Sequence, residues 1–329
     1  AMITSSLVTH LILMNRLDNN LLSIICILIG MSIFSIQDVL IRLLSNEVST
    51  FQILFTRSIV GSSLLVVYLR VMKIKIEFAT NYLLLTIFRG IIFLFGFALF
   101  YVGLANLSFA ICTSLFFTAP FFVTILSKVF LGETIGIRRW LTVLFGFLGV
   151  LIIADPFSSE FNYYMIFPIL CAMCYAGAMI IIKVTSDKDN VYAQTFHFYF
   201  TAMILCPISA LIGNIFNLHD PSNQITDFMF RSWAYNFDIN LLLMILVGLT
   251  AVLAFVFTIS AYRLGKPYIV APFEYILLVW AVIYGRLIWG ETISSQSWIG
   301  IFIIVTGGIY IFYRERINNQ ILATDQTIR

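Results

Sequence analysis

The sequence has few charged residues: Asp, Glu, Lys and Arg together make up 11% of the 329 positions. Hydrophobic residues make up 61%, and the mean hydropathy is +1.00. A water-soluble domain of this size could not hide so much apolar surface in its interior. The composition therefore excludes a water-soluble protein and indicates that lipid surrounds most of the chain.

The sequence also lacks the short motifs of nucleotide and metal chemistry. It contains no GxxxxGK[ST] loop, no HExxH, and only three histidines, which are not spaced as a metal cluster. A pump driven by ATP bound to this chain is therefore not expected, and no nucleophile and base point to an enzyme. We expect no cofactor and no metal. The net charge of +3 gives no indication of a nucleic-acid partner.

Cysteine is scarce, and its five copies are scattered through apolar runs. Cys171 and Cys174 form a CxxC pattern, but inside an apolar run without charged or histidine neighbours. Free cysteine in such surroundings behaves as a small hydrophobic residue. The pattern favours packing over redox or metal chemistry.

One stretch of the chain occurs twice. Residues 131–135 read Leu-Gly-Glu-Thr-Ile with Trp140 following, and residues 289–293 read Trp-Gly-Glu-Thr-Ile with Trp298 following. A shift of about 158 positions superposes the two copies and also places Gly90 on Gly248. The sequence thus predicts an internal duplication.

Ten apolar runs are long enough to cross a membrane, which takes about 20 residues per helix. They fall in two groups of five, so we expect a cytoplasmic segment 1–21, a first five-helix repeat 22–156, a second 161–313 and a cytoplasmic tail 314–329. The connection 214–238 is long enough for a surface segment with an interfacial piece. The ten expected helices are 22–44, 51–70, 81–101, 107–129, 138–155, 161–183, 192–213, 239–262, 267–288 and 297–313.

The positive charges predict how the chain is oriented, because Lys and Arg concentrate in cytoplasmic loops. One set of alternate connections carries most of them, and the opposite set carries only Arg231 and Arg286. Both termini should therefore face the cytoplasm of a bacterial inner membrane. The first set comprises Arg16, Arg70, Lys73, Lys75, Lys128, Arg138, Arg139, Lys183, Lys188, Arg263, Lys266, Arg314, Arg316 and Arg329.

An odd number of helices per repeat inverts the second half relative to the first. Inverted repeats are the usual scaffold of secondary transporters, because two similar halves give inward-open and outward-open states of similar energy. The fold expected from the sequence is an all-α polytopic membrane protein of ten helices in two inverted five-helix repeats.

Three stretches carry a resemblance to a known family. They are Phe-Thr-Ala-Pro-Phe-Phe-Val-Thr at 117–124, Leu-Gly-Glu at 131–133 and Ala-Pro-Phe-Glu-Tyr at 271–275. With the ten expected helices they resemble the EamA-type drug/metabolite transporter superfamily over nearly the whole chain, and within it bacterial S-adenosylmethionine or amino-acid permeases. The resemblance implies a central cavity lined mainly by helices 1, 3, 4, 6, 8 and 9.

Charged residues inside spanning helices are costly and are hypotheses for function by default. Asp38 and Glu274 are candidates for binding a substrate ammonium or a coupling proton, and Arg89 for a carboxylate or as a partner of Glu274. Simpler readings stay open: Asp38 could neutralise Arg42, Arg89 and Glu274 could form a static pair, and Arg57 could reach the outer interface. His197 is expected to pack between helices.

Aromatic residues should share the expected cavity. Phe34 lies on the helical face of Asp38, Tyr175 takes the corresponding place in the sixth helix, and Phe116 is the repeat counterpart of Glu274. Rings beside a carboxylate suit an organic cation or an ammonium group. Pro120 and Pro272 free backbone carbonyls, which a membrane protein tolerates where they line a cavity.

The sequence therefore predicts a secondary active transporter for a small zwitterionic or cationic organic metabolite, such as an amino acid or S-adenosylmethionine, working by alternating access. Its partners would be the substrate, membrane lipid and a coupled proton or exchanged metabolite. Two alternatives stay open: an efflux carrier for hydrophobic drugs or amino acids, and a non-transporting membrane protein such as a lipid scramblase.

Overall fold

The computed structural model describes residues 19–75, 78–132, 136–154, 162–235, 238–292, 295, 298–300, 302–303 and 306. All regular structure in these ranges is helical. The main elements are α2 (Asn19–Leu44), α3 (Thr50–Val71), α4 (Leu83–Asn106), α5 (Phe109–Phe116), α6 (Ala119–Leu131), α7 (Ile137–Ala154), η2 (Tyr163–Met165), α8 (Ile166–Val184), η3 (Thr185–Asp187), α9 (Val191–Ile215), α10 (Gln224–Phe230), α11 (Ile239–Leu264), α12 (Pro267–Val270), η4 (Ala271–Tyr275) and α13 (Ile276–Trp289).

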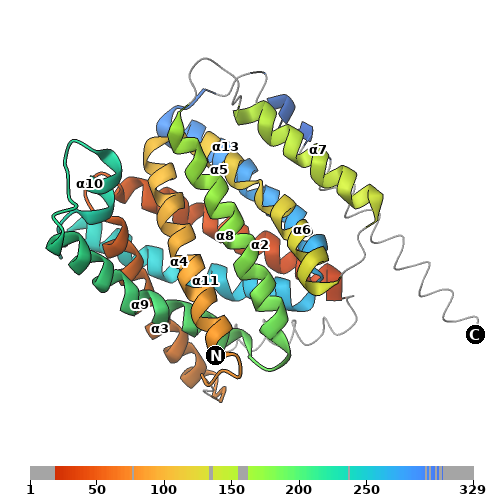
Figure 1. Ribbon diagram of the computed structural model, residues 1–329, viewed down its shortest axis with the longest axis horizontal. Helices are drawn as coiled ribbons and strands as arrows, with labels where there is room; N and C mark the ends of the chain where they lie inside the picture. Colours follow the sequence, from red (N-terminus) through yellow and green to blue (C-terminus); the bar gives the residue numbers. More distant parts are fainter. Residues whose placement is uncertain are drawn as a thin grey trace, which may run out of the picture.

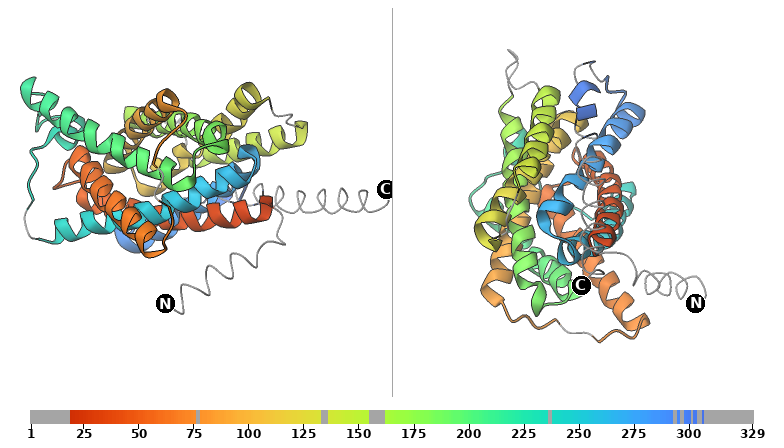
Figure 2. Two further views of the ribbon diagram at one scale, coloured as in Figure 1. Left: turned by 90° about the horizontal axis from the view of Figure 1, so that it is seen from below. Right: turned by 90° about the vertical axis from the view of Figure 1, so that its right-hand side faces the viewer.

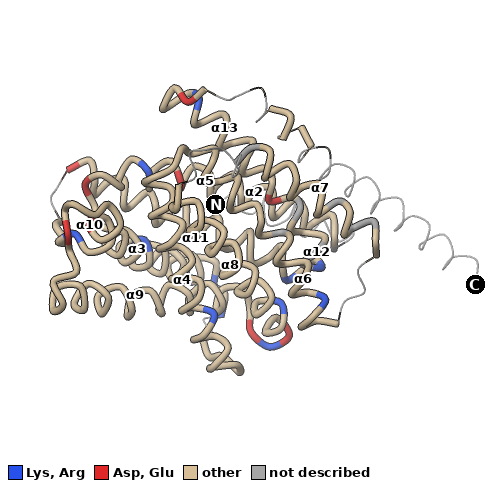
Figure 3. The backbone as a smooth tube through the Cα atoms, turned by 45° about the horizontal axis from the view of Figure 1, so that its top comes forward, with Lys and Arg blue, Asp and Glu red and all other residues tan. Residues whose placement is uncertain are grey.

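Seven helices in the described part are long and apolar enough to cross a membrane. The chain is therefore a multi-pass helical membrane protein, as its composition indicates. Figure 3 shows charged residues sparse along the helices and gathered mostly toward helix ends and connections. The seven helices are 20–44, 50–71, 83–106, 109–131, 163–187, 191–215 and 239–264.

Two of the expected spanning segments are interrupted within their length. The fourth consists of α5 and α6, which separate at Phe117 and Thr118, and the ninth consists of α12, the 3₁₀ turn η4 and α13. Pro120 and Pro272 lie within a turn of these breaks, and proline has no backbone N–H to continue a helix. The expected tenth helix, 297–313, lies mostly outside the described residues.

The helices form two layers. In one layer α9, α4, α8 and α6 lie side by side, and in the other α3, α11, α2 and α13 lie side by side (Figure 1). The right-hand view of Figure 2 shows the layers edge on. Contacts of α3 with α9 and of α13 with α5 join the layers at their two ends. A space enclosed by both layers is thus left at the centre of the molecule.

Glycines allow close approach where helices cross. A Cβ atom added to Gly90 of α4 would lie 2.5 Å from Thr201 Oγ1 of α9, and one added to Gly248 of α11 would lie 2.5 Å from Val60 Cβ of α3. Small residues at crossings are typical of membrane helices, because they let backbones pack closely. The two glycines that the sequence shift superposes therefore serve the same packing purpose.

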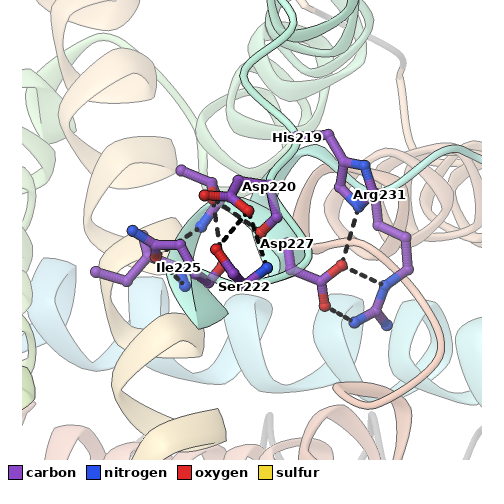
Figure 4. Close-up of polar contacts among 8 residues, drawn as sticks. His219, Asp220, Ser222, Ile225, Asp227 and Arg231 are labelled. Carbon is purple, nitrogen blue, oxygen red and sulfur yellow. Dashed lines mark hydrogen bonds and ion pairs between the residues drawn. The ribbon is translucent and has the colours of Figure 1, made fainter.

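The long connection 214–238 contains its own short helix, α10. The Asn223 side chain accepts a hydrogen bond from the Ile225 amide at the start of α10, and Asp220 accepts from the Ser222 hydroxyl at 2.7 Å (Figure 4). Asp227 accepts hydrogen bonds from Arg231 and from His219. The hydrogen bond from Arg231 lowers the pKa of the Asp227 carboxyl below its ordinary value.

Candidate functional site

A small cavity lies between the two layers. Its volume is about 40 Å³, enough for a few water molecules but far below the roughly 300–1,000 Å³ typical of metabolite pockets. This conformation is therefore closed around the site. The lining residues come from α2, α4, α5, α8 and α13: Met31, Phe34, Asp38, Phe93, Gly96, Phe97, Phe100, Phe116, Cys171, Tyr175 and Leu277.

The wall of the cavity is mostly aromatic. Phe116 packs edge to face against Tyr175 at 5.3 Å between ring centroids, and Phe93 stacks on Phe97 at 5.1 Å. Phe34 reaches Phe97 from the opposite layer at 6.4 Å. Such rings present their negative faces and exclude water, which strengthens any charge interaction inside.

Asp38 is the charged member of the lining. Its side chain is 4% exposed, and within the described part of the chain it makes no hydrogen bond and no ion pair. A buried carboxylate without a partner is unfavourable unless a ligand or a proton completes it. Arg42, the alternative partner of Asp38 left open by the sequence, donates to Glu291 at 2.7 Å instead.

Glu274 is hydrogen-bonded to Tyr175, which is a residue of the cavity wall. It is fully buried in η4, and its Oε1 accepts hydrogen bonds from the Tyr175 hydroxyl at 2.5 Å and the Tyr262 hydroxyl at 2.6 Å. Its Oε2 has no partner among the described residues. Because Tyr175 also lines the cavity, its hydroxyl connects the Glu274 carboxyl to the central space. Tyr262 was not singled out by the sequence.

Arg89 does not line this cavity, and its role at a substrate site stays a prediction. Its Nη2 donates to the backbone carbonyl of Gln194 in α9 at 2.8 Å, and the described part of the chain contains no ion pair between Arg89 and Glu274. Arg89, Phe93 and Phe97 are four residues apart and share one face of α4, but Arg89 lies a turn closer to the start of the helix, beside Gln194 of α9. In α9, His197 Nε2 donates a hydrogen bond to the Phe78 carbonyl at 2.6 Å.

Arg57 is fully buried, whereas the sequence favoured a position at the outer interface. Its guanidinium lies 4.3 Å from the centre of the Phe97 ring and donates to the Tyr101 hydroxyl at 3.0 Å. The place of Arg57 near the start of the expected helix 51–70 suggested the outer half of the membrane, but rings from α4, α9 and α11 surround its guanidinium. Only the tertiary arrangement could show this burial.

A comparison with known protein families shows to which family the chain belongs. The model of the EamA-like transporter family matches the chain twice, at residues 21–154 and 162–313. The chain belongs to the EamA-like transporter family. This confirms the resemblance carried by the 117–124, 131–133 and 271–275 stretches, and it makes the protein a membrane transporter.

Individual relatives of this EamA-like chain are distant but cover most of it. The S-adenosylmethionine uptake transporter of Rickettsia bellii is 25% identical over 86% of this chain and 90% of the relative. The pseudopaline exporter of Pseudomonas aeruginosa is 27% identical over 84% and 90%, and the riboflavin transporter of Brucella anthropi is 27% identical over 60% and 65%.

A solved structure has the same fold as this EamA-like chain. It superposes with a TM-score of 0.64 over 88% of this chain and 96% of the other, at 13% sequence identity. This likeness concerns the fold alone. The similar relatives include importers and an exporter, so the family does not fix the direction of transport.

Proposed function

We propose that this EamA-like protein is a secondary transporter that moves a small zwitterionic or cationic organic metabolite across the bacterial inner membrane by alternating access. One observation carries the proposal: Asp38 presents a buried carboxylate, which has no hydrogen bond or ion pair within the described residues, to a small cavity walled by aromatic rings. A cation enclosed there would gain both a charge pair and contacts with ring faces. The closed cavity must widen to admit such a metabolite, as alternating access requires.

The relatives suggest which metabolites to try. S-adenosylmethionine, named for the Rickettsia relatives, carries an ammonium, a sulfonium and a carboxylate, which fits a site with an acidic residue among aromatic rings. Riboflavin, named for the Brucella relative, is flat and uncharged and would use the rings alone. We therefore propose S-adenosylmethionine or a related amino acid as the first substrate class. The proposal includes no catalytic step.

The inverted repeat with ten spans belongs to this proposal and has support in the packing. Under the repeat α2 corresponds to α8, α3 to α9 and α4 to α11. Each packed pair of helices should then have a counterpart made of the corresponding helices. Thus α2 packs on α11 as α8 packs on α4, and α3 packs on α11 as α9 packs on α4. The turn glycines Gly132 and Gly290 also share one left-handed conformation, with φ of 65°. Both termini would face the cytoplasm, by the distribution of Lys and Arg.

Asp38 would bind the substrate, and Glu274 would couple transport to a proton. Asp38 lines the cavity and would contact the substrate ammonium, together with Phe34, Phe116 and Tyr175. Glu274, which is separated from the cavity by the Tyr175 hydroxyl, would take up and release the coupling proton. Protonation changes the hydrogen bonds that a carboxyl makes, so the Tyr175 side chain would report the state of Glu274 to the site.

A ligand screen tests the proposal. The purified protein is heated with S-adenosylmethionine, riboflavin and a panel of amino acids and organic cations, because a ligand that binds the native state raises the melting temperature. We expect stabilisation by a zwitterionic or cationic compound, and loss of that stabilisation in Asp38→Asn. Glu47→Gln, a carboxyl-to-amide change at an exposed residue, is the control. Stabilisation of Asp38→Asn equal to that of the unaltered protein would exclude the proposed site.

A further inference from the structure

Arg57 is a buried cation whose hydrogen-bonding capacity is mostly unused. The residue is 0% exposed, and among the described residues Nη1 of its guanidinium has one partner, the Tyr101 hydroxyl, while Nε and Nη2 have none. Buried polar groups are normally hydrogen-bonded, and an unmatched buried charge is costly. A buried arginine with unused donors points to a ligand that accepts hydrogen bonds from them.

Arg42 and Arg89, which also lie in spanning helices, differ from Arg57. Arg42 has the Glu291 carboxylate as its partner, and Arg89 has the Gln194 backbone carbonyl. Arg57 has no carboxylate and no carbonyl partner within the described residues, and is surrounded by the rings of Phe97, Phe198 and Phe255 at 4.3, 5.7 and 5.2 Å. Rings stabilise the positive charge without using its N–H groups.

Arg57 and the cavity share one side chain, Phe97. The Phe97 ring lines the cavity and also carries the Arg57 guanidinium on its face. Asp38 lies on the cavity side, and the fields of the two opposite charges act on each other although no ion pair joins them in the described part of the chain. A rotation of Phe97 would open the unused Arg57 donors to the cavity.

We propose that Arg57 binds the carboxylate of the substrate while Asp38 binds its ammonium, so that the transport site selects zwitterions with an α-amino-acid head group. The inference rests on the proposed function and narrows its substrate class. In a molecule of this class the two charges are fixed close together, and the site presents an anion and a planar cation on either side of Phe97. The guanidinium fork suits a carboxylate, since two parallel N–H groups can bind its two oxygens. Without substrate, Phe97 covers the cation.

Paired probes that differ only in the carboxyl group test this assignment. They are S-adenosylmethionine with its decarboxylated form, and phenylalanine, tyrosine and methionine each with the corresponding amine. Binding to the full-length protein is measured for each member by melting temperature and by calorimetry. The unaltered protein should bind the carboxylated member at least about tenfold more tightly, as expected for charge-assisted hydrogen bonds.

The variants assign that preference to one residue. In Arg57→Gln the ratio of the two affinities should fall toward one, with the affinity for the amine unchanged. Arg57→Lys keeps the charge but loses the fork, so its ratio should be intermediate, and this variant also serves if Arg57→Gln does not fold. Arg89→Gln removes another buried arginine that contacts no cavity residue, and it should keep the ratio of the unaltered protein.

The possible failures can be told apart. Equal affinities of the unaltered protein for both members of a pair would overturn the role of Arg57 and leave the transporter proposal standing. An unchanged ratio in the Arg57 variants would overturn it as well. If the protein binds neither member of any pair, the proposed zwitterionic or cationic substrate class is wrong, and the carboxylate role of Arg57 is lost with it.

Discussion

At the scale of single residues, Glu274 offers a clean substitution. Gln at this position keeps an amide oxygen that can accept hydrogen bonds from Tyr175 and Tyr262, so the buried hydroxyls stay satisfied. We expect Glu274→Gln to keep the melting temperature within a few degrees, because no charge pair is broken. Uptake driven by a proton gradient should be lost, since an amide does not titrate. Any uptake that remains should not vary with pH. Uptake by Glu274→Gln that follows the pH profile of the unaltered protein would return Glu274 to a purely architectural role.

The residues of the site differ in how far the sequence could predict them. Phe34, Asp38, Phe116 and Tyr175 were expected in the cavity from helical spacing and the internal repeat, and all four line it. Their roles in binding stay predictions. Arg89 does not line this cavity, because residues one turn apart on one helical face can have different neighbours, and its role in binding stays a prediction.

The partners of these residues were beyond sequence reasoning. Tyr262, which donates to Glu274, is one of 15 tyrosines, and nothing in its neighbours distinguishes it. The burial of Arg57 depends on three helices that meet around it, and the ion pair of Arg42 with Glu291 joins residues 249 positions apart. Long-range pairs of this kind follow from the packing of layers and not from local pattern.

At the scale of helices, the crossing glycines make matched predictions. Gly90→Ala and Gly248→Ala should each destabilise the protein by about 1–3 kcal/mol, because the new methyl group would meet Thr201 or Val60 inside van der Waals distance. Gly136→Ala is the control, since nothing lies within 4 Å of its added Cβ. Melting curves in detergent measure all three. Wild-type stability in Gly248→Ala would show that the α3–α11 crossing is looser than the structure has it.

The pair formed by Arg42 and Glu291 joins α2 to the turn after α13. Glu291 Oε1 also accepts a hydrogen bond from the Phe109 amide at 3.0 Å, and Arg42 stacks on the Trp289 ring at 4.2 Å. Arg42→Met should keep the stacking but leave a largely buried carboxylate without its cation, and so cost about 1.5–3 kcal/mol.

A double replacement checks that reading of the pair. Adding Glu291→Gln to Arg42→Met removes the unpaired charge while an amide oxygen still accepts from the Phe109 amide, so part of the lost stability should return. Chemical or thermal unfolding of the two variants and the unaltered protein gives the comparison. A double variant less stable than Arg42→Met alone would show that Glu291 stabilises the turn without help from Arg42.

The α10 segment should respond to acid. The pKa of Asp227 is lowered in the folded protein by the hydrogen bond from Arg231, so this carboxylate contributes stability above its ordinary pKa of about 4. The contribution is lost as pH falls through the lowered value. For a partly exposed pair it should amount to about 0.5–1 kcal/mol. The difference in stability between the unaltered protein and Asp227→Asn should therefore be full at pH 7 and shrink as pH falls below about 4. A difference that does not shrink with acid would need another cause.

The helices themselves were largely predictable, and their interruptions were not. Nine expected runs coincide with described helices to within a few residues, because long apolar segments leave the backbone no other way to satisfy its hydrogen bonds in lipid. The breaks at Phe117 and within η4 lie close to Pro120 and Pro272, but a proline alone does not determine whether a membrane helix bends or ends.

At the scale of the whole molecule, the duplication was visible in the sequence, while the order of helices in each layer was not. Equivalent residues such as Gly90 and Gly248 indicate that the halves are alike, yet they do not say which half contacts which. The structure interleaves them, so that α11 of the second half lies beside α2 and α3, and α4 lies beside α8 and α9. The central cavity is therefore built from both halves, as a site that opens alternately to two sides requires.

Uptake into liposomes tests the central claim most directly. The protein and its Asp38→Asn variant are reconstituted in parallel, and entry of labelled S-adenosylmethionine, or of whichever metabolite stabilises the protein in the screen, is measured together with the flipping of a fluorescent lipid. The account predicts saturable metabolite uptake by the unaltered protein, loss of uptake in Asp38→Asn, and no lipid flipping by either. Equal uptake by the two proteins, or lipid flipping without metabolite uptake, would contradict it.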